Sequence, residues 1–293
     1  MSESLTRPET PNPIRVAGEV VLAAQGVSKQ YPVPGGVRVV LDGVDFEVLR
    51  GQVATIVGPS GAGKTTLLQC MAGLLAPSSG RVVLDGKPIT EPPEGLAVVF
   101  QDYSRSLMPW LSVRHNVELP LRGRRVGRRE RRERALAALA DVGLSASGEL
   151  FPWQLSGGMQ QRVAIARALA YQSEVLLMDE PFASVDAQTR ADLEDLLLRL
   201  RNRLNITIAL VTHDIDEAVY LGDVVVVLGG SPTRVEARLR VGLGPDRDQI
   251  LTKAEPEFLK IRAHVLAKIR APRDSGSRAS GCPVETGLPK GAQ

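Results

Sequence analysis

The sequence predicts an α/β protein with a mainly parallel core sheet, an N-terminal antiparallel β-subdomain and an inserted helical subdomain. Three observations support this fold class: apolar runs of strand length that recur along the chain, an alternating pattern near its start, and a long middle stretch without strands. The composition is 43% hydrophobic and 24% charged over 293 residues, which is typical of a globular protein.

The parallel core is predicted from five short apolar runs. Each run is continuous and does not alternate, which is typical of strands covered on both faces by helices. The runs cover residues 53–57, 97–100, 175–178, 206–211 and 224–228.

The two subdomains are predicted from different patterns. Residues 20–24 and 37–48 alternate between apolar and polar and flank the turn-rich sequence YPVPGG, so we expect an antiparallel subsheet there. Residues 102–172 contain no convincing strand and are expected to form helices inserted into the core domain.

The domain boundaries follow from changes in composition. We expect the main domain to cover residues 19–230, followed by an extension over 231–270, and the polar ends 1–18 and 271–293 to be disordered. Within the extension, residues 255–270 predict an amphipathic helix that packs on its own domain. Its apolar face would carry Phe258, Leu259, Ile261, Val265, Leu266 and Ile269.

Composition also excludes several classes of protein. No apolar run approaches the roughly 18 residues of a membrane-spanning helix, and the first residues lack the apolar stretch of a secretory signal, so we expect a cytoplasmic protein. Two cysteines argue against a disulfide framework. The net charge, 36 basic minus 33 acidic residues or +3, is too small to indicate a nucleic-acid partner.

A phosphate-binding loop follows the first apolar core run. The sequence matches G-x-x-x-x-G-K-[ST] between a predicted strand and a predicted helix, the context that makes a plain glycine turn with a surface lysine a poor alternative. Its backbone N–H groups and the helix start would bind phosphate, while Lys64 reaches the β- and γ-phosphates and Thr65 ligates Mg²⁺. The fold is therefore that of a P-loop NTPase. The motif consists of Gly58, Pro59, Ser60, Gly61, Ala62, Gly63, Lys64, Thr65 and Thr66.

Two adjacent carboxylates end the apolar run 175–178. Alone, Asp179 and Glu180 before Pro181 would indicate an exposed acidic turn. Beside a phosphate-binding loop they predict a division of roles, in which Asp179 holds Mg²⁺ and Glu180 polarises the attacking water.

A second helix start carries small residues. Ser156, Gly157 and Gly158 precede the helical sequence VAIARALAY, which is compatible with an ordinary helix cap and with a second anion-binding helix start.

The stretch LSGGMQQRVAIARAL resembles the signature sequence of ABC transporter nucleotide-binding subunits, and it lies between the loop and the carboxylates as in that family. The resemblance covers residues 19–230. It implies an ATP- and Mg²⁺-dependent ATPase that works as a head-to-tail dimer, a homodimer or a pair of related subunits. Ser156, Gly157 and Gly158 of one subunit would then close over ATP held by the loop of the other.

Four further positions match elements of that family. By resemblance, Tyr31 would stack on adenine, Gln101 would approach Mg²⁺ and the water, Asp186 would lie in the loop joining the two composite sites, and His213 would contact the γ-phosphate. Taken alone, Tyr31 is compatible with plain packing and His213 with a simple hydrogen-bonded histidine.

Two positions depart from the family pattern. Met159 stands where many members have Gln, and Val185 where many have Leu. Both replacements conserve bulk, so the expectation of hydrolysis is unchanged.

The stretches VVFQDYSRSLMPWLSVRHNVELPL, THDIDEAVYLGD and PFASVDAQTR resemble the bacterial importers of the nitrate, sulfonate and taurine group. The resemblance implies a subunit at the cytoplasmic face of the inner membrane, which powers uptake of a small solute through a separate permease served by a periplasmic solute-binding protein. Residues 108–111 would meet the permease, although burial of Trp110 inside the helical subdomain is equally compatible.

The run RGRRVGRRERRER over 122–134 contains eight arginines and two glutamates. Such a run is compatible with a solvated helix face or with contact to anionic lipid head groups.

Other functions sharing this cassette are an exporter or lipid-flipping ATPase, and a DNA- or ribosome-acting ATPase. The latter group usually carries a coiled-coil insertion or a second cassette, and the sequence shows neither. A small-molecule kinase would not explain the Ser156–Gly158 helix start or the Asp179–Glu180 pair.

Overall fold

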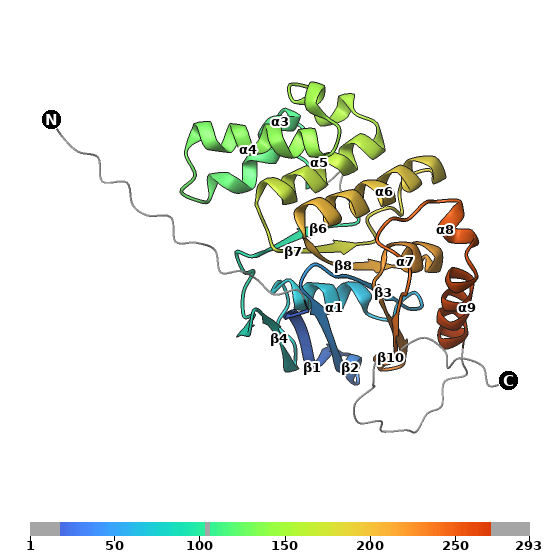
Figure 1. Ribbon diagram of the computed structural model, residues 1–293. Helices are drawn as coiled ribbons and strands as arrows, with labels where there is room; N and C mark the ends of the chain where they lie inside the picture. The colour runs from blue at the N-terminus through green and yellow to red at the C-terminus, as the bar shows by residue number, and fades with distance from the viewer. Residues whose placement is uncertain (1–17, 103–105, 271–293) are drawn as a thin grey trace.

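The computed structural model describes residues 18–102 and 106–270 (Figure 1). The two ends expected to be disordered therefore lie outside the described residues, apart from Gly18. In the described ranges no helix combines the length and apolar character needed to span a bilayer.

The core is a parallel sheet, as predicted. Each of the five apolar runs forms a strand, and their pairing with one another is parallel throughout. All residues of the central strand are buried, which explains why its sequence does not alternate. The strands, in spatial order, are β9 (Val224–Gly230), β3 (Val53–Val57), β8 (Thr207–Thr212), β7 (Val175–Asp179) and β6 (Leu96–Val99).

The antiparallel subsheet is confirmed and is continuous with the core. Strands β1 (Val20–Val33) and β2 (Gly36–Leu49) form its hairpin, and β4 (Ser79–Leu84) and β5 (Lys87–Pro88) extend it. The connecting strand β10 (Thr233–Arg240) runs antiparallel to β9.

Strand β10 joins the two parts because Thr233 pairs with Leu41 of β2. The ten strands of the described ranges therefore form one sheet, with the order β5-β4-β1-β2-β10-β9-β3-β8-β7-β6. The sheet continues past residue 230, where we expected the main domain to end.

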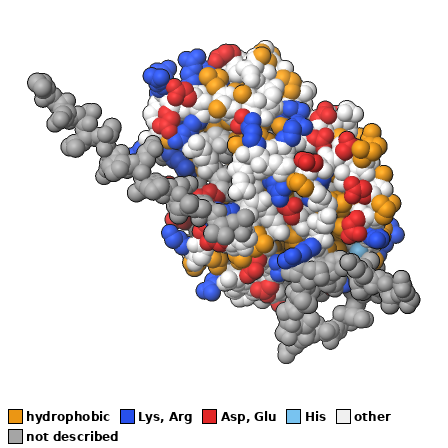
Figure 2. Space-filling view, viewed as in Figure 1, with side chains coloured by type: hydrophobic (Ala, Val, Ile, Leu, Met, Phe, Trp, Pro, Cys, Tyr) orange, Lys and Arg blue, Asp and Glu red, His pale blue; other side chains and the backbone are white. Residues whose placement is uncertain are grey.

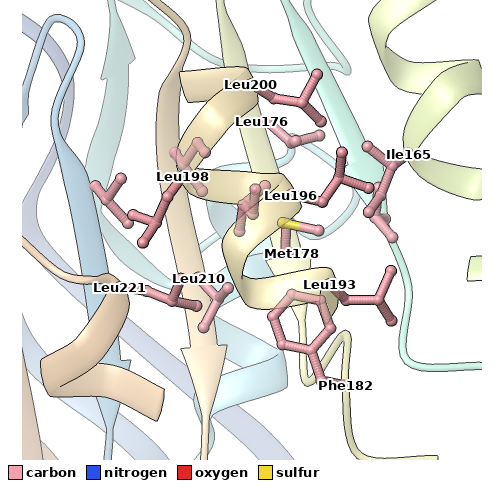
Figure 3. Packing of buried hydrophobic residues seen from close by; sticks show 14 of the residues in the cluster. Ile165, Leu176, Met178, Phe182, Leu193, Leu196, Leu198, Leu200, Leu210 and Leu221 are labelled. Atoms are coloured by element: carbon pink, nitrogen blue, oxygen red, sulfur yellow. The ribbon is translucent and has the colours of Figure 1, made fainter. Parts of the chain in front are cut away.

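Helices cover both faces of the core sheet (Figure 1). Residues of β3 alternate between two clusters: Val53 and Val57 face the side that holds α6 (Ala187–Leu204), whereas Ala54 and Ile56 face α1 (Lys64–Met71). Figure 3 shows the α6 side, where leucines of α6 pack over β7 and β8. The labelled side chains there are Ile165, Leu176, Met178, Phe182, Leu193, Leu196, Leu198, Leu200, Leu210 and Leu221.

The inserted segment is helical over its described residues. A buried amide holds its first turn, because Asn116 Nδ2 donates to the carbonyls of Met108, Leu111 and Ser112. The helices α3, α4 and α5 pack on one another at the top of Figure 1. The elements are α3 (Val113–Glu118), η1 (Leu119–Arg122), α4 (Arg128–Asp141), η2 (Ser145–Ser147), η3 (Pro152–Gln154) and α5 (Gly157–Ala170).

The C-terminal helices α8 (Leu251–Ala254) and α9 (Pro256–Arg270) pack beside α7 (Ile215–Leu221) and the β9–β10 hairpin. Phe258, Ile261 and Val265 are buried. Placing Leu259 on the same face was wrong: it is 48% exposed, because it lies about 100° around the helix from Phe258.

Candidate functional site

The glycine loop follows β3 at its carboxyl end, and α1 begins at Lys64. Gly63 has φ +71°, and a Cβ there would lie 2.6 Å from Val40 Cγ1. Gly61 has φ +76°, and a Cβ there would meet nothing within 4 Å. The loop thus needs glycine at position 63, where it packs against β2, and leaves open space at position 61. A loop that binds phosphate through its backbone N–H groups needs both features.

Lys64 is only 7% exposed, and its side chain bends back along the loop. Its Nζ donates to the carbonyl oxygens of Gly58 at 3.0 Å and Pro59 at 3.2 Å. Burial lowers the pKa of Lys64, and the nearby carboxylates Glu180 and Asp179 oppose that shift. A polyanion in the loop would restore favourable interactions to this desolvated charge.

Thr65 and Asp179, which the sequence predicts as metal ligands, lie side by side, with Thr65 Oγ1 donating to Asp179 Oδ1 at 3.4 Å. Asp179 is 5% exposed, and burial raises its pKa. A hydroxyl and a desolvated carboxylate are oxygen ligands that fit Mg²⁺. Across the described residues no three His, Cys, Asp or Glu side chains gather to hold a metal ion, so phosphate and water oxygens would complete its coordination.

Glu180 lies just beyond β7 and is fixed from two sides. Its backbone has φ +43°, and its N–H donates to Val211 O of the neighbouring strand at 2.8 Å. Its Oε2 accepts from Gln101 Nε2 at 3.3 Å and lies 3.1 Å from His213 Nδ1. The carboxylate is therefore oriented by residues that follow β6 and β8.

Parallel pairing explains why these residues meet. The loop, Asp179, His213 and Gln101 all lie at or after the carboxyl ends of adjacent strands, which share one edge of the sheet. The His213 side chain is 57% exposed and that of Glu180 is 20% exposed, so the carboxylate lies deeper than the imidazole.

The second helix start lies apart from this cluster. Ser156 caps α5, its Oγ accepting from Met159 N at 3.3 Å, and Ser156 and Gly157 are exposed. Over the described part of the chain, no hydrogen bond joins residues 156–158 to the loop 58–66. Gly158 instead packs on α6, where a Cβ would lie 2.3 Å from Thr189 Cγ2.

Asp186 caps the start of α6. Its carboxylate accepts from Thr189 N at 3.0 Å and Thr189 Oγ1 at 2.6 Å, and these bonds lower its pKa. Thr189 thus lies between the Asp186 carboxylate and Gly158, and Asp186 and Ser156 are both exposed, which leaves their polar groups accessible to another molecule.

Tyr31 lies on β1 beside Arg38 of β2, with Lys29 Nζ 5.5 Å from its ring centroid. A hollow of about 120 Å³ lies between the glycine loop, β2 and the β9–β10 turn, and Tyr31 does not line it. Its lining residues are Arg38, Val39, Val40, Pro59, Ser60, Gly61, Ala62, Gly230, Ser231, Pro232 and Thr233.

Sequence reasoning missed an ion pair behind the cluster. Arg190 Nη1 of α6 lies 3.4 Å from Asp214 Oδ2, and Asp214 caps α7 directly after His213. The sequence signals the cap, since an Asp precedes a helical run, but not its partner on α6.

Known proteins resemble this chain over most of its length. Residues 41–183 match the ABC transporter family. The taurine import ATP-binding protein TauB of Chromobacterium violaceum is 44% identical over 257 residues, 86% of this chain and 97% of that protein. TauB of Pseudomonas putida is 42% identical over 259 residues, 87% of this chain and 97% of that protein.

A solved structure shows the same architecture. The dimeric structure of a bacterial ABC transporter cassette has a TM-score of 0.67 and 33% sequence identity, and the match covers 76% of this chain and 100% of that cassette.

Proposed function

The chain belongs to the ABC transporter family and is an ATP-binding, ATP-hydrolysing subunit, and from this premise we propose that it powers solute import through a separate membrane permease. The relatives named above are taurine import proteins, so we propose a small anion of the taurine, sulfonate or nitrate kind as the solute. The subunit would then act peripherally at the cytoplasmic face of the membrane, and a periplasmic binding protein would deliver the solute.

The observation that carries the proposal is the cluster at the strand ends. The loop amides and Lys64 would hold the triphosphate, and Thr65, Asp179 and Gln101 would hold Mg²⁺, which supplies charge neutralisation at the phosphates when bound. Glu180 would orient the attacking water and accept its proton. Gln101 and His213 would keep that carboxylate in place.

A second copy of the chain would complete the site. Ser156, Gly157 and Asp186 are exposed, and residues 156–158 make no hydrogen bond to their own glycine loop in the described chain. We propose a homodimer in which these residues face the nucleotide held by the other copy. Two nucleotides would then be enclosed between the two subunits.

Light scattering on hydrolysis-deficient protein tests this assembly. Glu180→Gln should dimerise with saturating Mg²⁺ and ATP, because binding is retained while release by hydrolysis is blocked. Lys64→Ala is the matched control and should stay monomeric, because the loop loses its positive charge for the phosphates. A Glu180→Gln protein that stays monomeric with Mg²⁺, ATP and permease would contradict the composite site.

Import is tested with the complete complex. The chain, its permease and a solute-binding protein reconstituted in vesicles should hydrolyse ATP faster when taurine or a related anion is supplied on the binding-protein side. Stimulation by an internal solute that is carried outward would instead indicate an exporter.

A further inference from the structure

We propose that the arginine-rich end of α4 in the helical subdomain is a docking surface for anionic phospholipid. This surface, called here the arginine patch, consists of Arg122, Arg125, Arg128 and Arg132. The inference rests on the proposed function only in placing the subunit beside a bilayer.

The other four arginines of 122–134 contact groups of their own chain, and the arginine patch consists of the four that form no ion pair within the described residues. Arg129 and Arg134 pair with Glu133 and Glu130, the two acidic residues of the run. Arg124 lies 3.8 Å from the Tyr171 ring centroid and donates to Glu94 O.

Arg131 donates to Val126 O through Nη1. The four patch arginines are exposed, and no carboxylate of the described ranges forms an ion pair with them. Glu149, whose pKa Arg132 helps to lower, is held by Arg114. The run therefore presents a net excess of cationic groups to solvent.

These charges act against the helix that carries them. Helix α4 begins with Arg128 and Arg129, its cap Gly127 provides no side-chain hydrogen bond, and Glu130 is the acidic residue of its first turn. Cations near a helix N-terminus are disfavoured by the helix dipole. Cations at an uncapped helix start cost stability, and phosphates outside the chain would offset that cost.

The same subdomain also presents an exposed aromatic residue. Trp110 is 71% exposed, and its turn is attached to α3 through the hydrogen bonds of Asn116 to Met108 and Leu111. Residues 108–111 are expected to meet the permease, and arginine favours the phosphates of the head groups that surround such a membrane partner. Figure 2 shows Lys and Arg side chains gathered at the upper left of the molecule, where Figure 1 places α4.

Charge complementarity points to a bilayer and not to nucleic acid. The chain as a whole carries a formal charge of only +3, so the attraction is local to this end of the subdomain. A flat array of phosphates beside a membrane-bound partner matches four exposed guanidinium groups, each of which gains roughly a fivefold preference at a charged surface.

Vesicle sedimentation of the full chain tests the proposal. Wild-type protein should bind vesicles of phosphatidylcholine with one third phosphatidylglycerol, bind pure phosphatidylcholine much less, and lose binding as salt is raised. The variant R122Q/R125Q/R128Q/R132Q should bind the anionic vesicles on the order of several hundredfold more weakly, since four roughly fivefold preferences multiply.

A matched variant controls for net charge. R81Q/K87Q/R199Q/R240Q removes four exposed cations from other elements and should bind the anionic vesicles within a few-fold of wild type. Both variants should keep wild-type ATPase activity in solution, which separates failure of this proposal from failure of the proposed function.

Equal binding of wild type to both vesicle types, or equal loss in both variants, would overturn lipid docking. The patch variant could instead bind vesicles like wild type but no longer copurify with the permease in lipid-free detergent. That result would show that the patch contacts protein, and it would also overturn lipid docking.

Discussion

His213 Nδ1 lies 3.1 Å from Glu180 Oε2, although the two residues are 33 positions apart in the sequence. Their parent strands, β8 and β7, are adjacent and parallel, so both side chains leave the sheet at the same edge. The same oxygen accepts from Gln101 Nε2, which follows β6. Three consecutive strands thus converge on one carboxylate oxygen.

This convergence predicts a graded loss of turnover. Glu180→Gln should lower kcat by about 10² to 10⁴, the usual contribution of a general base, with nucleotide affinity retained. His213→Ala should lower kcat less, since Gln101 still holds the carboxylate. Steady-state ATPase assays and equilibrium nucleotide binding measure the two effects. The control is Asp192→Asn, an exposed acid on α6 away from the strand ends, which should leave kcat unchanged. Equal kcat values for Glu180→Gln and wild type would refute the role of Glu180.

The ion pair between Arg190 and Asp214 predicts a positioning effect. Asp214 follows His213 and caps α7 through bonds to the N–H groups of Asp216 and Glu217, so Arg190 anchors this loop to α6. Arg190→Ala should lower kcat roughly tenfold with little change in nucleotide affinity, because a displaced His213 misplaces Glu180.

A double-mutant cycle with Asp214→Ala checks this link. The coupling in unfolding free energy should be about 0.5–1 kcal/mol, since both side chains are about one third exposed. Rescue of kcat by Arg190→Lys would support positioning through charge, and additive effects of the two single substitutions would argue against a coupled pair.

The sequence predicts the buried strands well, for a physical reason. All five residues of β3 are buried, and a short apolar run that ends at a glycine loop is typical of a strand covered on both faces. Strand β10 was not predicted because its sequence TRVEARLR carries charged side chains on its open face. Such alternation with Arg and Glu is also common in surface loops and helices.

Relationships in space were harder to predict. The sequence leaves both burial and exposure open for Trp110, and in the structure the side chain is exposed while the buried Asn116 binds Met108 N before it. The Arg190–Asp214 pair depends on how α6 and α7 pack, which no local pattern encodes. The hollow beside the loop is lined by residues other than Tyr31. The contact of Tyr31 with adenine therefore stays a prediction.

The close contact of Gly158 with Thr189 predicts a rescue experiment. Gly158→Ala should weaken ATPase activity, because its Cβ would meet Thr189 Cγ2 at 2.3 Å and push the start of α5 away from α6. Thr189 has little freedom to move, since its Oγ1 donates to Asp186 at 2.6 Å. Adding Thr189→Ser removes Cγ2 and keeps the hydroxyl, so the double variant should regain most of the activity. Absence of rescue would show that the glycine is needed for a contact outside its own chain.

The buried carboxyl of Glu217 predicts a pH dependence of stability. Glu217 is 5% exposed, and its Oε1 has no hydrogen-bond partner among the residues that the structure describes. Burial together with Glu194 and Asp214 raises its pKa to about 8, while Thr212 and Arg190 oppose the shift. A pKa above the unfolded value of 4.5 means that the folded chain holds a proton that the unfolded chain releases between these values. The free energy of unfolding should therefore fall as pH rises through this window, by on the order of a few kcal/mol.

Glu217→Gln isolates this contribution, because the amide keeps the shape of the protonated acid and cannot titrate. Urea unfolding at about pH 5 and about pH 8 should show a smaller loss of stability in Glu217→Gln than in wild type, with the variant more stable at the higher pH. Glu91→Gln, at an exposed position, serves as the control and should follow the wild-type profile. Parallel profiles for Glu217→Gln and wild type would mean that Glu217 is ionised in the folded protein, with Arg190 compensating its charge.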